Sequence, residues 1–331
     1  MKKLTIFLLS VFLMGSVFVG RTEAIPIDNY TMAFSNFYST LPDLTLVDEA
    51  AIFTGYSYVK IDPTKGADPN NIDAGDPFVD YVVWRLTGFK DELSNMITPT
   101  GYGTTHEITL ISKLTGVHTG VLPTGQFLFT FDAFDVGDAS GNYMNMILDA
   151  ETGFTVSNYN NLNTFADGKV VEKADIQQTG IGPEGNWGNF NFINNPPSGE
   201  ISLNRLHALY GDEVDSNGDP IPFELDEYGN DLLALYPDWI MLDVDSNNDQ
   251  ETGPAVLAQN ETSWENYFFG GANSIDLTRT DASGRPIEFF TKSDGSVNKE
   301  VIPEPATMLL LGSGLIGLAG FARKKKFFKK D

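Results

Sequence analysis

Short runs in which apolar and polar residues alternate constrain the fold of this chain more than any other feature. In the clearest run, Phe127, Phe129 and Phe131 are separated by single residues. A period of two residues is that of a β-strand, because successive side chains point to opposite faces. We expect the phenylalanine face to be buried. Comparable runs, each of which predicts a strand, occupy residues 31–38, 51–61, 78–86, 107–114 and 286–291.

Turn-forming residues fill the segments between these runs. Many short strands separated by such turns predict an all-β fold, namely an antiparallel β-sandwich or jelly-roll-like body. Only residues 202–210 and 231–236 have helical character, and the second segment begins at a potential cap, Asp231, and stops at Pro237. We therefore expect one or two short helices. The segments rich in Gly, Pro, Asn and Asp are 62–76, 137–142, 179–188 and 194–199.

The first 24 residues have the pattern of a secretory signal peptide. Lys2 and Lys3 precede an uncharged, mainly apolar run that ends at Gly20, which predicts a signal helix. Small residues are needed at the cleavage site, and Thr22 and Ala24 meet that need. We expect export and a mature chain that begins at residue 25, with an uncleaved N-terminal anchor as the alternative.

The C-terminal segment, residues 303–331, has three parts in a fixed order. Pro303-Glu304-Pro305 comes first, and its two prolines favour an extended backbone. Residues 306–322 follow without a charge, and as a helix they would span about 25 Å, near the minimum for a bilayer. Six basic residues between 323 and 330 place the end of the chain in the cytoplasm. The sequence thus predicts a transmembrane helix at 306–322 and an extracytoplasmic body at 25–302.

This tail resembles a known sorting signal. The string Val301-Ile302-Pro303-Glu304-Pro305-Ala306-Thr307-Met308-Leu309-Leu310, followed by Gly-Leu-Ile-Gly-Leu-Ala-Gly, is similar to the PEP-CTERM sorting signal. The resemblance implies processing by an exosortase-like membrane enzyme of Gram-negative bacteria, with Pro303, Glu304 and Pro305 as the processing signal. Such bacteria often secrete polysaccharide, so it also implies delivery to the cell surface or an extracellular matrix. An ordinary membrane anchor is the alternative.

The body is strongly acidic and lacks cysteine. Between residues 25 and 305 lie 12 basic and 43 acidic residues, which give a net charge of −31. Such a surface repels nucleic acid and anionic lipid, so we expect no nucleic-acid partner. It favours cations, neutral glycans and solubility. The absence of Cys excludes disulfides, thiolate metal sites and a cysteine nucleophile.

Two similar acidic strings, thirty residues apart, are the sharpest internal feature. Oxygen ligands at alternate positions of a tight turn can converge on Ca²⁺, which takes six to eight oxygens. Both strings resemble the start of an EF-hand loop, but Pro220 and Gln250 stand where its glycine belongs. A calcium site and a pair of solvated acidic turns therefore both fit this pattern. The candidate ligands are Asp215, Asn217 and Asp219 in the first string and Asp243, Asp245, Asn247 and Asp249 in the second.

Other candidate chemistry is weaker. Asp68, Asp73 and Asp76 form a less regular acidic loop that could hold an ion. Trp187, inside Gly-Asn-Trp-Gly-Asn, is the tryptophan expected to be exposed and to offer a face for a sugar ring, whereas Trp84 should be half-buried in a strand.

No catalytic motif is present, so we expect no enzymatic activity. The histidines at 106, 118 and 207 are far apart, and the chain contains neither H-E-x-x-H nor G-x-S-x-G. The sequence predicts a non-enzymatic, exported cell-surface or matrix protein that associates with secreted polysaccharide in a biofilm or floc. Two alternatives stay open. One is a calcium-dependent adhesin or glycan-binding module, and the other is a secreted polysaccharide hydrolase, whose two carboxylates leave no local motif.

Overall fold

The structure is a computed structural model, and it divides the chain into two compact units. It describes residues 25–27, 29–47, 50–90, 95–177, 186–191, 198–236, 240–249, 261–271 and 274–301. The first unit comprises residues 1–26 and 300–331. Its described part is a short antiparallel pairing of β1 (Ile25–Pro26) with Val301 and Glu300. The second unit, residues 27–299, contains the other described residues.

The predicted helices at the two ends, residues 1–24 and 306–322, lie outside the described residues. Within the described part of the chain, no helix has the length and apolar character needed to cross a membrane. The boundaries of the signal peptide and the sorting tail therefore stay predictions.

The body is all-β and antiparallel, as the sequence predicts. Its main sheet contains twelve strands, and the runs at residues 51–61, 78–86, 107–114 and 286–291 each fall on a strand longer than the run itself. Besides β1 these strands are β4 (Ala50–Ile61), β5 (Pro77–Lys90), β6 (Met96–Ile97), β7 (Glu107–Val121), β8 (Phe127–Phe131), β9 (Tyr143–Asp149), β10 (Lys169–Ile176), β11 (Trp187–Asn191), β12 (Ser198–Tyr210), β14 (Ile240–Asp249) and β15 (Glu288–Val301).

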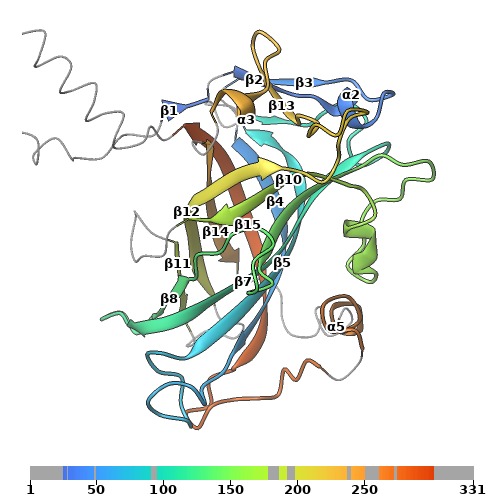
Figure 1. The fold of residues 1–331 in the computed structure, drawn as a ribbon. Coiled ribbons are helices and arrows are strands. Elements are labelled where there is room, and N and C mark those ends of the chain that lie inside the picture. The colour runs from blue at the N-terminus through green and yellow to red at the C-terminus, as the bar shows by residue number, and fades with distance from the viewer. Residues whose placement is uncertain are drawn as a thin grey trace, which may run out of the picture. The chain divides into compact units, whose positions relative to one another are not determined.

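The strand pairings of the main sheet close into a ring (Figure 1). From β7 the pairings run through β9, β10, β12, β14, β15, β4 and β5, and β5 pairs with β7 again. β8 and β11 make a second connection between β7 and β12. Because side chains alternate along each strand, one face of β4, β5, β7, β9, β10 and β12 points to a shared interior.

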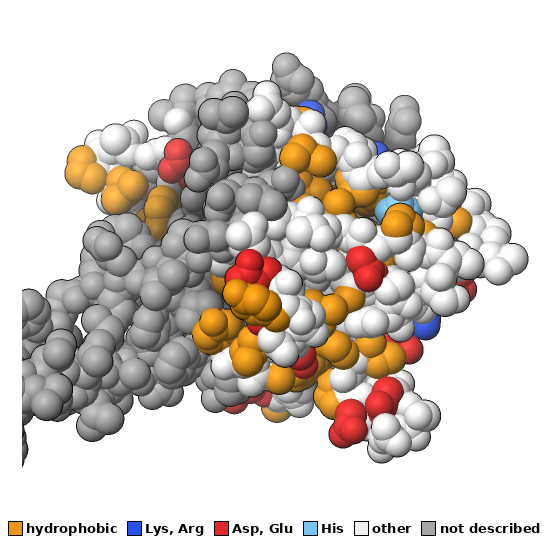
Figure 2. Space-filling model, turned by 90° about the horizontal axis from the view of Figure 1, so that it is seen from above, with side chains coloured by type: hydrophobic (Ala, Val, Ile, Leu, Met, Phe, Trp, Pro, Cys, Tyr) orange, Lys and Arg blue, Asp and Glu red, His pale blue; other side chains and the backbone are white. Residues whose placement is uncertain are grey.

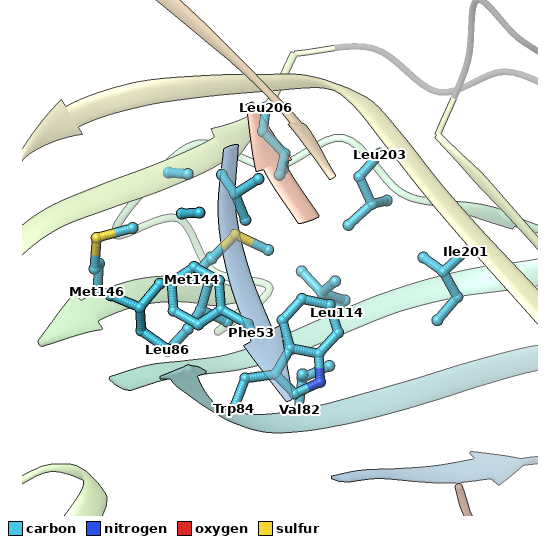
Figure 3. Close-up of a cluster of buried hydrophobic side chains, with 14 of the residues drawn as sticks. Phe53, Val82, Trp84, Leu86, Leu114, Met144, Met146, Ile201, Leu203 and Leu206 are labelled. Carbon is cyan, nitrogen blue, oxygen red and sulfur yellow. The ribbon is translucent and has the colours of Figure 1, made fainter. Parts of the chain in front are cut away.

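That interior is a single apolar core (Figure 3). Phe53, Leu86 and Met146 point into it from β4, β5 and β9. The predicted phenylalanine face of residues 127–131 is confirmed, since all three phenylalanines are buried. Trp84 is more buried than expected, at 4% exposure, because it also faces this core. The chain therefore stabilises its body by apolar burial, in the absence of disulfides.

Part of the outer face of the sheet is buried as well. The helix α5 (Glu261–Phe269) and the 3₁₀ turn η1 (Leu162–Phe165) contribute side chains to a second apolar cluster. Trp264 of α5 is fully buried, and its ring lies 5.1 Å from that of Phe290 on β15. No pattern in the sequence predicted α5. Because α5 covers this part of the outer face, Tyr58 on β4 and Tyr81 on β5 are buried although they point outward.

A smaller three-stranded sheet has the order β13-β2-β3, formed by β13 (Glu224–Asp226), β2 (Asn29–Met32) and β3 (Leu44–Val47). The short helices α2 (Phe34–Phe37) and α3 (Leu232–Leu235) accompany it. Their apolar residues join the main core, and the ring of Phe34 lies 5.6 Å from that of His106 at the start of β7. The predicted cap of α3 is confirmed, because the Asp231 carboxylate accepts a hydrogen bond from Leu233 N.

Two of the local predictions are wrong. Residues 202–210 are not helical but belong to β12. A β-bulge between Leu203 and Leu206 puts both leucines on the inner face, so a spacing of three residues fits a strand here. The predicted strand 31–38 ends at residue 32, because the chain turns into α2 and buries Phe34 and Phe37 on one side of that helical turn.

Candidate functional site

The first acidic string forms a tight, exposed turn, as expected. The Asp215 N–H donates to the Asp219 carbonyl (2.8 Å), and the Gly218 N–H donates to the Asp215 carbonyl (3.1 Å). Gly218 has a φ of 89°, which glycine adopts without strain. The carboxylate of Asp215 closes the turn from inside, because Oδ1 accepts the N–H groups of Asn217 (2.8 Å) and Asp219 (3.0 Å). The hydrogen bonds from the backbone of Asp219 and then Asn217 hold the pKa of Asp215 below its usual value.

The same turn recurs twice. Asp226 Oδ1 accepts the N–H groups of Tyr228 and Asn230 at 2.9 and 2.7 Å. Asp281 Oδ1 accepts the N–H groups of residues 283 and 285, both at 2.9 Å. In each case a glycine with positive φ precedes the last turn residue. The D-x-x-G-x string is thus a turn motif whose carboxylate oxygens already bind backbone amides.

The hairpin between β7 and β8 shows that this turn does not require the aspartate. Its backbone bonds, from Leu122 N to Gln126 O and from Gly125 N to Leu122 O, are both 2.8 Å long. Calcium binding at the Asp215 turn stays a prediction. Both backbone N–H groups bind Oδ1, whereas Oδ2 accepts the Asn217 side-chain amide at 3.1 Å.

The second acidic string does not form a turn. Residues 243–249 lie in β14, where Asp245 pairs with Ser202 and Asn247 pairs with Glu200. The predicted tight turn is therefore wrong at this position. Residues at every second position of a strand stand about 6.6 Å apart, so Asp243, Asp245, Asn247 and Asp249 extend over about 20 Å. The backbone here is therefore not the tight turn that was expected, and calcium binding by these four residues stays a prediction.

The loop between β4 and β5 uses its aspartates internally. Asp76 is fully buried, and its two oxygens accept the N–H groups of Gly66 and Asp73, both at 2.7 Å. Asp73 in turn accepts the N–H of Asp68 at 2.6 Å. Burial raises the pKa of Asp76 despite these bonds. Within the described ranges, no three His, Asp or Glu side chains are grouped as a metal site would need.

Trp187 is not on an exposed loop. It begins β11, pairs with Thr130 on one side and Ser202 on the other, and is half-buried, with its indole nitrogen fully buried. The expected loop is therefore wrong, but Trp187 is more exposed than the buried Trp84 and Trp264, and its contact with a sugar ring stays a prediction. Gly188 and Asn189, two of the neighbours that suggested a loop, instead occupy strand positions, and Gly188 packs close to β12.

The three histidines lie apart and are buried. His106 packs on Phe34, and the ring of His118 lies 5.1 Å from that of Phe127. His207 lies beside Asp175, with Nδ1 3.5 Å from the carboxylate. Their surroundings are those of packing residues.

Two buried carboxylates were not singled out by the sequence analysis. Asp80 of β5 is 1% exposed on the inner face, and Glu107 of β7 is fully buried on the outer face. Burial raises the pKa of each to about 7. Glu107 accepts hydrogen bonds from the backbone N–H (2.7 Å) and the hydroxyl (3.1 Å) of Ser157. The only signal in the sequence is an acidic residue inside an otherwise apolar strand.

A surface hollow next to Glu107 was also missed. Its volume is about 280 Å³, and Arg85 lies at its side. The residues that line it are Arg85, Leu86, Thr87, Tyr102, Gly103 and Val156. An arginine at an outward strand position, in a body with few basic residues, is the signal that points to it.

The processing residues Pro303, Glu304 and Pro305 lie outside the described residues, so the comparison with known families is informative. The family model of the PEP-CTERM protein-sorting motif matches residues 301–325. Neither a curated protein nor a solved structure matches the chain. Residues 301–325 are therefore a PEP-CTERM sorting motif, which marks this protein as one exported to the cell envelope or surface and processed by an exosortase-like enzyme.

Proposed function

We propose that the mature body acts without catalysis at the cell surface or in the extracellular matrix of a Gram-negative bacterium, where it associates with secreted polysaccharide. The sorting motif at residues 301–325 carries this proposal, because it determines where the body is delivered. The body itself is a closed sheet around one core, which suits a protein that must stay folded outside the cell without disulfides.

The surface charge supports a solvated matrix component. Figure 2 shows acidic side chains dispersed over one face of the molecule, among apolar and uncharged groups. A net charge of −31 keeps such a protein soluble and limits its self-association. The carboxylates with the most raised pKa, Asp80 and Glu107, are closed off from solvent. A hydrolase needs its two carboxylates at an open cleft, so these residues do not favour hydrolysis.

The association is tested by following the full chain in a polysaccharide-producing bacterium that has an exosortase. The protein should sediment with the polysaccharide in that strain and stay in the supernatant of a matched strain that cannot synthesise it. The same distribution in both strains would refute the association. Release by a calcium chelator would favour the calcium-dependent adhesin. New reducing ends in purified polysaccharide incubated with the protein would favour the hydrolase.

A further inference from the structure

Three segments surround the hollow of about 280 Å³ on the outer face of β5. Arg85, Leu86 and Thr87 come from the strand, Tyr102 and Gly103 come from the turn before β7, and Val156 comes from the segment after β9. The volume lies just below the range of about 300–1,000 Å³ that is usual for small-molecule sites. It offers room for one sugar residue.

The wall of the hollow is fixed by hydrogen bonds. The Tyr102 hydroxyl lies 2.8 Å from the Leu86 carbonyl and accepts the Ile108 N–H at 3.0 Å. Gly103, with a φ of 70°, donates its N–H to the His106 carbonyl at 2.8 Å and holds the turn against β7. A wall held in this way is organised before any ligand arrives, so little ordering is needed on binding.

Arg85 brings unused hydrogen-bond donors to this hollow. Its guanidinium group has five N–H donors, and within the described residues its one hydrogen bond is long, 3.4 Å from Nη1 to the Ser157 carbonyl. The nearby carboxylate of Glu107 bonds to Ser157 rather than to Arg85. The guanidinium group therefore keeps its fork of donors for a planar, two-oxygen acceptor, the chemistry that arginine recognises best.

We infer that the hollow beside Arg85 binds the carboxylate of an acidic sugar residue in the secreted polysaccharide. Arg85 would hold the two carboxylate oxygens, while Val156, 42% exposed at the rim, would contact an apolar face of the sugar ring. This inference rests on the proposed function, because it names the chemical unit of the polysaccharide that the body recognises.

Screening by salt limits the distance over which the charge of the body acts against this ligand. A net charge of −31 repels an anion, but at physiological ionic strength screening limits the repulsion to about 8 Å. Inside that range the guanidinium group attracts the bound carboxylate. The structure therefore assigns the specificity to one short-range contact rather than to the overall field.

The test measures binding of a galacturonic acid trimer to the mature protein isolated from producing cells. A neutral galactose trimer and acetate serve as comparison ligands. We expect the acidic trimer to bind at least about tenfold more tightly than either. Equal binding of the neutral trimer would overturn the inference, as would equal binding of acetate, which would reveal a site for any small anion.

Variants locate the site. Arg85→Gln should weaken binding of the acidic trimer at least about tenfold, and Arg85→Lys should recover part of it, because lysine keeps the charge without the fork. Lys65→Gln removes the same charge from an exposed loop outside the hollow and should change nothing. Should Arg85→Gln unfold, Val156→Asp puts a repelling carboxylate at the exposed rim and should abolish binding.

Undiminished binding by Arg85→Gln or Val156→Asp would overturn the inference. Sedimentation of the same variants with the native polysaccharide separates this result from failure of the proposed function. A variant that loses the trimer and also leaves the polysaccharide supports both proposals. If the variants bind trimer and polysaccharide as wild type does, the association stands but this hollow is not its site.

Discussion

The Tyr58 hydroxyl donates a 2.8 Å hydrogen bond to Glu288 Oε2, which joins β4 to β15 across 230 residues of sequence. Glu288 is only 1% exposed, and it also accepts from Arg279 (2.6 Å) and from the Asp276 N–H (2.9 Å), with Lys60 at 3.1 Å. Burial alone would raise the pKa of Glu288, but the hydrogen bonds from Asp276, Tyr58 and Lys60 outweigh it and lower the pKa. One carboxylate thus ties two strands and a loop together.

Replacing this carboxylate should destabilise the body. Glu288→Gln leaves Lys60 and Arg279 without their partner, and we expect a loss of about 1–3 kcal/mol in the free energy of unfolding, because both cations are partly solvated. Asp212→Asn breaks the ion pair between Lys173 and the exposed Asp212 and should cost less than about 1 kcal/mol. Chemical denaturation measures both, and equal losses would contradict the role given to Glu288.

The pH dependence of the same variant has a definite sign. A carboxylate with a lowered folded-state pKa stabilises the fold above its unfolded pKa, here 4.5, and this contribution disappears as the pH falls through the folded value. The difference between wild type and Glu288→Gln should therefore be full at pH 7 and shrink below pH 4.5. A difference independent of pH would mean that the charge of Glu288 is unimportant.

Asp80 should affect the pH dependence of stability in the opposite direction to Glu288. It is buried in the core, and burial raises its pKa from 3.8 to about 7 against the hydrogen bond from Ser57. The folded state then holds the proton more tightly than the unfolded chain, so stability falls as the pH rises from 3.8 to about 7. Asp80→Asn should unfold at higher denaturant than wild type at pH 8, by up to a few kcal/mol, and show little gain at pH 4.

The control for Asp80 is the exposed Asp135. Asp135→Asn removes the same charge from the surface and should not reproduce the gain in stability of Asp80→Asn at pH 8. A profile of Asp80→Asn that parallels wild type between pH 4 and pH 8 would show that Asp80 does not titrate in the folded core.

Local patterning predicted much of this fold, and long-range packing decided the rest. The strand around Phe129 was predictable, because the alternation of apolar and polar residues depends only on neighbouring positions in the sequence. The helix predicted at residues 202–210 was wrong, because the bulge between Leu203 and Leu206 creates a helical spacing of apolar residues within a strand. The helix α5 was missed because its buried Trp264 acquires its role only when β15 and η1 lie beside it. The ring of pairings likewise depends on strand partners far apart in sequence.

Among the candidate sites, too, those specified by neighbouring residues were predictable, and those formed by distant segments were not. The turn at Asp215 was predictable, because glycine and aspartate at fixed offsets specify a turn locally. The string at residues 243–249 has nearly the same composition, yet pairing with β12 makes it a strand. The hollow beside Arg85 is formed by three segments that lie apart in the sequence. Only the arginine at an outward strand position could have indicated it.

Calcium binding at the Asp215 turn can be separated from simple screening. At millimolar Ca²⁺ the melting midpoint of the body should rise more than in Mg²⁺ of equal ionic strength, with about 2.7 kcal/mol gained at one hundred times Kd. Asp215→Ala should remove the response. Asp226→Ala is the matched control, because it breaks the same kind of turn but has Tyr228 where the first string has Asn217.

Both alanine variants should be slightly less stable than wild type without calcium, since each removes a carboxylate that binds two backbone amides. An equal response to the two ions, or a calcium response retained by Asp215→Ala, would identify the first string as an acidic turn without a metal role.

The sorting motif makes a separate prediction. Pro303→Ala combined with Glu304→Ala should leave synthesis intact and retain the protein at the cell envelope, because the recognition residues are lost while the apolar segment 306–322 remains. Fractionation compares it with Pro286→Ala combined with Glu227→Ala, which changes the same residue types in the body and should be released normally. Equal release of both double variants would show that the tripeptide is incidental.

Mass spectrometry of the extracellular polysaccharide fraction tests the central claim most directly, because the account joins delivery, removal of the sorting tail and association with polysaccharide. We predict abundant peptides from residues 25–302, an N-terminus near Ile25 and no peptides from residues 306–331. Absence of the body from this fraction, or recovery there of an intact C-terminus through Asp331, would contradict the account.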